Sequence, residues 1–166
     1  MSRAGCRKER DDDAGAIRAV LEAAFGGTTE ADLVEALRAD GDLVLGWVYE
    51  DAAEVLGYVA YSRVEVFRDA RTAVAAVGLA PLAVVPDLQG EGIGSFLVIS
   101  SLGLLKQENE SLVFVLGDPA YYSRFNFAVV DGYVSRYAGP YFQALRLSPD
   151  APDAGRVKYA KAFDKL

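Results

Sequence analysis

Apolar residues at the start of the chain recur every three or four positions, as they do along one face of a helix. Over residues 13–25 these positions are Ile17, Val20, Leu21, Ala24 and Phe25. A second amphipathic stretch over 28–41 predicts another helix, with Thr29 as its N-cap and Gly41 as its end. Two amphipathic helices are therefore expected to open the fold.

From residue 42 the pattern changes to one typical of strands. Runs rich in Val, Leu, Tyr and Trp cover 42–50 and 54–66, and the short polar link between them predicts an antiparallel hairpin. A third run over 72–85 is almost entirely apolar, as expected for a central strand buried on both faces. Pro81 interrupts this run and must lie at a bulge or an edge, because proline has no N–H to donate to a neighbouring strand.

The second half of the chain alternates helical and extended patterns. The predicted elements are a helix over 95–108, a central strand over 111–118, a short helix over 119–126, and closing strands over 127–137 and 141–148. This order predicts an α/β fold in which a mixed parallel and antiparallel sheet is flanked by helices. No internal repeat accompanies it.

A chain of 166 residues with 52% hydrophobic content is the size of one ordinary domain. We assign residues 13–148 to this domain and residues 1–12 to a lead-in or an edge strand. Residues 149–166 are rich in Pro and Asp at their start and are interpreted as a C-terminal tail.

Composition excludes several classes of function. Histidine is absent and Cys6 is the only cysteine, so a Ser-His or Cys-His nucleophile is excluded and no metal cofactor is expected. One cysteine forms no intramolecular disulfide, and neither a signal peptide nor a membrane span is visible, so we expect a cytoplasmic protein without a membrane partner. The net charge of −7 and the lack of a basic stripe argue against nucleic acid.

Three glycines, Gly90, Gly92 and Gly94, follow the predicted central strand and precede a helix. Such a turn forms an anion site, because unpaired N–H groups converge at the helix start. A Walker A loop would need a lysine after the last glycine, where Ser95 stands. The Rossmann pattern would need a further glycine, where Ser95 or Leu97 stands. The ligand is therefore expected to carry phosphate in another type of loop.

Residues 89–94, with the sequence QGEGIG, fill the pattern Q/R-x-x-G-x-G. In this loop the chain resembles the GNAT superfamily of acyl-CoA-dependent N-acetyltransferases, where it cradles the coenzyme A pyrophosphate. Residues 122–127 resemble the second signature of the family, Y-x-x-x-G-F, with Tyr122 and Phe127 in place. Asn126 stands where glycine is usual, and asparagine tolerates positive φ.

The resemblance extends over about residues 13–148, and residues 116–127, LGDPAYYSRFNF, are similar to a bacterial branch of predicted acetyltransferases. It implies a GNAT-like fold in which two central strands splay to admit acetyl-CoA, the co-substrate. It also implies a set of coenzyme-binding residues. These are Val84, Val85, Gln89, Gly90, Glu91, Gly92, Ile93, Gly94 and Ser95.

The expected chemistry is direct attack of an amine on the thioester, with no metal. A strand N–H stabilises the oxyanion, and the resemblance implies that it lies near Val84 and Val85. A tyrosine can protonate the departing thiolate, since the reference pKa values of phenol and thiol are about 10 and 8.5. Tyr122 is the candidate general acid, whereas Asp118 is interpreted as an N-cap and Arg124 as a surface residue.

The general base stays open. Glu50 and Glu65 lie on the predicted hairpin, where a solvent-facing role is the more typical one. The acidic Glu91 is expected to point into solvent and to weaken coenzyme affinity. The acceptor is the primary amine of a small molecule, such as an amino-acid derivative or an antibiotic, or a protein amino group.

Two other functions are compatible with the sequence. One is an acyl-CoA-binding sensor or interaction domain that keeps the loop without catalysis. The other is an oligomeric module without CoA, for instance a homodimer, in which Val157, Tyr159 and Phe163 of the tail form the subunit contact.

Overall fold

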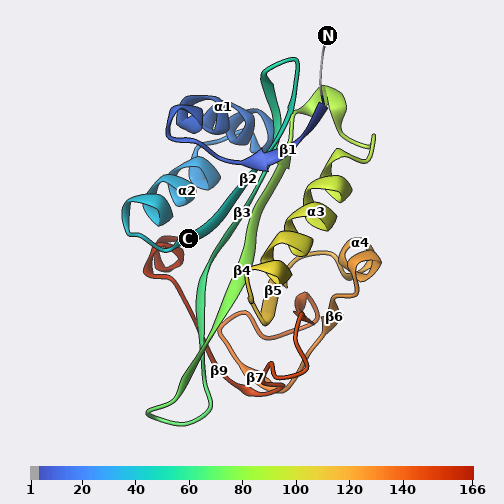
Figure 1. The fold of residues 1–166 in the computed structure, drawn as a ribbon. Helices are drawn as coiled ribbons and strands as arrows, with labels where there is room; N and C mark the ends of the chain where they lie inside the picture. Colours follow the sequence, from blue (N-terminus) through green and yellow to red (C-terminus); the bar gives the residue numbers. More distant parts are fainter. Residues whose placement is uncertain (1–3) are drawn as a thin grey trace.

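A computed structural model describes residues 4–166, and their strands form one sheet in the order β1-β2-β3-β4-β5-β8-β6, with β9 beside β3 and β7 (Figure 1). The strands are β1 (Ala4–Lys8), β2 (Leu43–Asp51), β3 (Glu54–Phe67), β4 (Ala73–Val84), β5 (Leu112–Leu116), β6 (Ala128–Val129), β7 (Tyr133–Val134), β8 (Phe142–Arg146) and β9 (Gly155–Tyr159). The α-helices are α1 (Ala14–Phe25), α2 (Thr29–Ala39), α3 (Ile93–Gln107) and α4 (Pro119–Tyr122). Short 3-10 helices are η1 (Asp11–Asp13), η2 (Pro86–Leu88), η3 (Ser123–Phe125) and η4 (Lys161–Lys165).

Helices cover both faces of this sheet, with α1 and α2 on one side and α3 and α4 on the other (Figure 1). The alternation of side chains along β3 explains the two layers. Tyr58 and Ala60 pack with α1 and α2, whereas Val59 and Tyr61 pack with α3. The mixed α/β architecture predicted from the sequence is confirmed.

The two central strands separate partway along their length. β4 and β5 run parallel and pair only from Val77 with Val113 to Leu79 with Val115. β4 continues to Val84 along β3, while β5 ends at Leu116. An opening therefore lies beside the second half of β4, on the side where β5 no longer pairs.

Pro81 lies at a bulge where this separation begins, as the sequence predicts. Val59 of β3 pairs with Leu82 and Tyr61 pairs with Leu79, so β4 contains one extra residue between these two pairs. Because the ladder is interrupted there, the missing N–H of proline breaks no regular hydrogen bond.

The N-terminal elements also follow the predictions, apart from one cap. β1 is an edge strand paired with β2, which selects the edge-strand alternative for residues 4–8, and residues 1–3 lie outside the described part. Thr29 is not an N-cap, because α2 begins at Thr29 and Thr28 precedes it without a side-chain capping bond. Between residues 4 and 166, no helix combines the length and the apolar character needed to cross a bilayer.

The predicted closing strand over 127–137 is wrong. Only the two-residue strands β6 and β7 form there, separated by a turn at Asp131 and Gly132. A Cβ atom on Gly132 would lie 2.6 Å from the carbonyl oxygen of Asp153. The turn is therefore shaped by its close approach to the segment that leads into β9.

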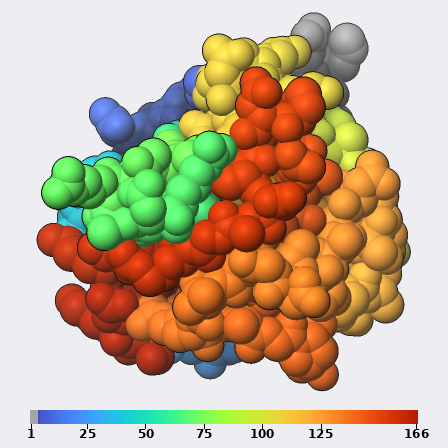
Figure 2. All heavy atoms as spheres, turned by 90° about the horizontal axis from the view of Figure 1, so that it is seen from below, coloured from blue at the N-terminus to red at the C-terminus, as the bar shows by residue number. Residues whose placement is uncertain are grey.

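The predicted tail is part of the fold. β9 pairs antiparallel with β3 from Val64 with Tyr159 to Phe67 with Arg156. Figure 2 shows residues near 150–160 in red lying between the green β3–β4 turn and the orange segment near 130–140. Within the chain, Val157 and Phe163 are buried in hydrophobic clusters, with Tyr159 packed against them. The boundary after residue 148 is therefore wrong, because the segment beyond it pairs with β3 and packs into the same core.

Candidate active site

The glycine loop leaves backbone N–H groups unpaired at the start of α3. Gly92 is the N-cap with φ of 90°, and the first helical bond runs from the Phe96 N–H to the Gly92 carbonyl at 3.0 Å. The N–H groups of Ile93, Gly94 and Ser95 therefore have no partner within the helix. They belong to the loop that lines a cavity of about 390 Å³ beside β4.

Glycine is required at these three positions for two different reasons. Gly90 and Gly92 have φ of 80° and 90°, a conformation that side chains rarely adopt, although a Cβ atom at either would meet open space. Gly94 instead leaves room for Tyr121, whose hydroxyl oxygen would lie 3.0 Å from a Cβ atom at this position. Two glycines thus shape the loop, and the third lets a tyrosine from α4 reach the helix start.

The loop is fastened to the end of β4. Gln89 donates a hydrogen bond from Nε2 to the carbonyl oxygen of Val84 at 3.0 Å. Glu91 is exposed to solvent, as expected. The negative side chain therefore projects from the outer side of the loop.

The backbone of β4 offers donors to the opening beside it. Val85 donates its N–H to the carbonyl of Leu56 on β3 at 3.0 Å. Because successive residues of a strand direct their N–H groups to opposite edges, those of Leu82 and Val84 point away from β3. Val85 is therefore unavailable as an oxyanion donor, and Leu82, which the sequence analysis did not single out, joins Val84 at the free edge.

Tyr122 is held by close packing behind its ring. Its ring lies against Gly117, where an added Cβ atom would be 2.6 Å from Cε2. The side-chain amide of the buried Gln143 donates to the carbonyls of Gly117 and Tyr141 at 3.0 and 3.2 Å, which fixes the segment before α4. Burial, with a smaller effect of Tyr121, raises the pKa of Tyr122 to about 12. The phenol is therefore protonated at neutral pH.

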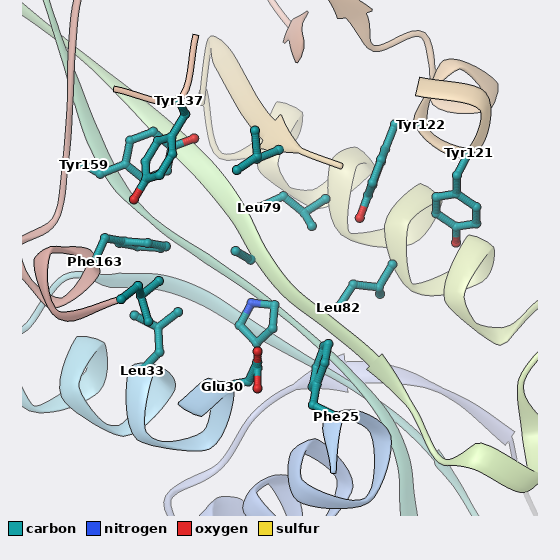
Figure 3. A pocket seen from close by; sticks show the side chains of 14 residues that line it. Phe25, Glu30, Leu33, Leu79, Leu82, Tyr121, Tyr122, Tyr137, Tyr159 and Phe163 are labelled. Carbon is teal, nitrogen blue, oxygen red and sulfur yellow. The ribbon is translucent and has the colours of Figure 1, made fainter. Parts of the chain in front are cut away.

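A second cavity of about 500 Å³ continues from the first. The two share Leu82 and Tyr121, which lie where they meet. In Figure 3, Tyr121 and Tyr122 lie on one side of this second cavity. The aromatic side chains on the other side are Tyr137, Tyr159 and Phe163. The full lining consists of Phe25, Glu30, Leu33, Leu79, Ala80, Pro81, Leu82, Leu116, Tyr121, Tyr122, Tyr137, Tyr159, Phe163 and Leu166.

Of the sequence candidates for a base, neither lines this second cavity. Glu50 pairs with Arg7 at 3.1 Å, and Glu65 is exposed on β3 opposite Lys158. The acid in the cavity is Glu30, in the first turn of α2. In the sequence it resembles any polar residue of an amphipathic helix, so the pattern gave no signal for it.

The short segment after β5 contains further residues of the site. Asp118 caps α4 by accepting a hydrogen bond from the N–H of Ala120 at 2.9 Å, as predicted. Arg124 lines the loop cavity and stacks over the Tyr121 ring, with 4.6 Å from the guanidinium carbon to the ring centre. The interpretation of Arg124 as a plain surface residue is therefore incomplete. In residues 4–166 no three His, Cys, Asp or Glu side chains cluster as metal ligands.

Comparisons with known proteins identify relatives over nearly the whole chain. The family described as "Acetyltransferase (GNAT) family" matches residues 15–127. The uncharacterized N-acetyltransferase YhbS of Escherichia coli strain K12 is 39% identical over 161 residues, which cover 93% of this chain and 95% of that protein. The crystal structure of YhbS in complex with CoA has a TM-score of 0.88 at 37% identity and covers 99% of this chain and 93% of that one.

A second solved structure is similar to the same degree. A GNAT family acetyltransferase from Brucella melitensis, crystallised with acetyl-CoA, has a TM-score of 0.83 at 38% identity. The match covers 98% of this chain and 99% of that one.

Proposed function

Because the chain belongs to the GNAT family of acetyltransferases, we propose that it moves an acetyl group from acetyl-CoA to a primary amine by direct attack. The observation that carries the proposal is the opening beside β4, which joins the loop cavity to the cavity of Tyr122. A long thioester needs such a path, with an anion site at one end and the reacting groups at the other. The solved relatives that contain CoA and acetyl-CoA support the same ligand.

The anion end is built from backbone groups. The free N–H groups of Ile93, Gly94 and Ser95 receive the pyrophosphate at the positive end of the α3 dipole. Arg124 is the cation that lines this cavity. Its charge counters the exposed Glu91 and supports binding of an acidic ligand.

The reacting end follows the free edge of β4. The N–H of Leu82 or Val84 donates to the oxyanion that forms when the neutral amine attacks the thioester carbonyl. The carbon–nitrogen bond then forms and the carbon–sulfur bond breaks. Tyr122 donates its proton to the departing thiolate, and the proton released from nitrogen returns to the phenolate through water. The net products are an N-acetyl amine and the free thiol of CoA.

The test combines binding and turnover in one sample. Calorimetric titration with acetyl-CoA is followed by an assay of thiol release over a panel of amines. We expect wild type to bind and Gly92→Asp not to bind. A residue with a side chain is strained at the φ of 90°, which distorts the loop, and the added carboxylate repels the phosphates. Tyr122→Phe should bind normally and release thiol about a hundredfold more slowly.

Each alternative has its own signature in this test. Absence of acetyl-CoA binding by wild type would refute the coenzyme site. Binding without turnover on any amine would favour the acyl-CoA sensor. An unchanged rate for Tyr122→Phe would refute the general acid while leaving the transfer reaction in place.

A further inference from the structure

We propose that the acceptor is a small amine with one cationic nitrogen on an aromatic or apolar body. The inference rests on the proposed function, because it assigns the acceptor half of the same cavity. Two independent features carry it, namely a carboxylate without a partner and an aromatic wall.

The carboxylate belongs to Glu30, the only charged side chain among the 14 residues that line the cavity. Figure 3 shows it pointing inward from α2. Within residues 4–166 it forms no salt bridge, whereas Glu22, Asp32 and Glu35 on the same helix pair all bind Arg18. A carboxylate beside apolar side chains loses part of its hydration, and an ion pair with an incoming cation offsets that loss. Glu30 is therefore placed to receive an ammonium group.

The wall opposite α4 is aromatic. Tyr159 packs edge-on against Tyr137 and Phe163, with ring centres 5.0 and 5.1 Å apart. Burial raises the pKa of Tyr159, so its phenol adds no charge. Leu33 extends the wall from α2. Aromatic and aliphatic groups of this kind bind the apolar body of a ligand, and aromatic faces also attract a cation.

The same features disfavour other acceptors. A polyamine or an aminoglycoside carries several positive charges, and the cavity lining has one acidic side chain to pair with them. The cavity of about 500 Å³ must also admit the thioester end of the coenzyme beside Leu82 and Tyr122. The remaining space suits a body of about one ring with a short linker.

The inference is tested with the full-length chain saturated with CoA, which permits binding without turnover. Calorimetric titration compares 2-phenylethylamine with 2-phenylethanol, its neutral counterpart, and with spermidine. We expect the amine to bind about tenfold more tightly than the alcohol, the effect of one charged hydrogen bond. Spermidine should bind more weakly than 2-phenylethylamine. Along unbranched alkylamines, affinity should rise about fourfold per methylene group.

Two variants assign the effect to the carboxylate. Glu30→Gln should remove the preference for amine over alcohol. Asp32→Asn is the matched control and should keep the preference, because it removes the same charge from the same helix at a position outside the cavity. The preceding CoA titration shows that each variant is folded. If Glu30→Gln did not fold, the comparison of amine with alcohol on wild type would still decide.

Equal affinity for amine and alcohol would overturn the inference, as would tighter binding of spermidine than of 2-phenylethylamine. Normal CoA binding alongside such a result would leave the proposed function intact. Loss of CoA binding by wild type would overturn both.

Discussion

Tyr122 retains its proton well beyond the ordinary range of a phenol. Burial first and Tyr121 second raise its pKa to about 12, and a raised pKa favours the neutral, proton-donating form. The rate of thiol release should therefore rise as the amine loses its proton and should not fall as the pH passes about 10, where an ordinary phenol ionises. A pH–rate profile up to about pH 11 measures this. A decline near pH 10 that Tyr122→Phe abolishes would contradict it.

Arg124 is expected to contribute to the binding of acetyl-CoA. It lines the loop cavity and stacks on Tyr121. Arg124→Ala should weaken acetyl-CoA binding about tenfold, because the proposed charged hydrogen bond to phosphate would be lost. The matched control is Arg156→Ala, which removes a similar stacking contact over Phe67 at 4.5 Å outside both cavities. Equal effects of the two substitutions on the dissociation constant would refute the assignment.

Single residues also show where sequence reasoning reaches its limit. Gln89, Gly92 and Tyr122 stand in local motifs, so their positions could be predicted. The role of Glu30 depends on which side of α2 faces a cavity whose other walls come from distant parts of the chain. No spacing within α2 contains that information.

At the scale of one helix, Gly103 within α3 and Gly92 at its N-cap should respond to substitution in opposite ways. Gly103 is exposed within the helix, and a Cβ atom there meets nothing within 4 Å. Gly103→Ala should raise the free energy of unfolding by about 0.5 to 1 kcal/mol and leave CoA affinity unchanged. Gly92→Ala should lower it by about 1 to 2 kcal/mol, because its φ of 90° is unfavourable for alanine. Urea unfolding measures both changes.

Comparing the two substitutions distinguishes backbone strain at one position from a general effect of alanine on the free energy of unfolding. Destabilisation by both substitutions would contradict the account of Gly103. Stabilisation by both would contradict the account of Gly92.

Elements with strong periodicity were predictable, and elements defined by distant pairing were not. The hairpin and α3 follow local hydrophobic patterns, and the bulge at Pro81 is predicted by the proline itself, which has no N–H to donate. β9 is short, with exposed Arg156 and Lys158 on either side of Val157. Its strand structure comes from pairing with β3, far away in the sequence. Composition therefore indicated a tail where the fold has a strand.

For the molecule as a whole, the cavity is a product of topology. Its walls come from α1 and α2, the bulge of β4, the end of β5, α4, the segment after β7, and the end of β9 with the chain that follows it (Figure 3). The splay between β4 and β5 opens the coenzyme side, and β9 carries Tyr159 to the opposite side. The C-terminal segment is thus needed for the proposed acceptor site as well as for the sheet.

Buried tyrosine side chains should make the stability of the whole molecule depend on pH in the alkaline range. Burial raises the pKa values of Tyr58, Tyr61, Tyr122 and Tyr159 above those of unfolded tyrosine. Above about pH 10 the unfolded chain releases these protons while the native chain keeps them. The unfolded state then binds fewer protons, so stability falls as the pH rises, by up to about 1.4 kcal/mol per pH unit for each such tyrosine.

Urea unfolding at a series of pH values should therefore give constant stability between about pH 7 and pH 9 and a decline above about pH 10. Tyr159→Phe should make this decline shallower, because one of the retained protons is removed. Tyr141→Phe should leave the slope unchanged, since Tyr141 is 59% exposed. The absorbance of phenolate should also report on the four buried tyrosines, which are expected to ionise only as the protein unfolds. Ionisation of all nine tyrosines near pH 10 without loss of stability would show that the interior is open to hydroxide and solvent.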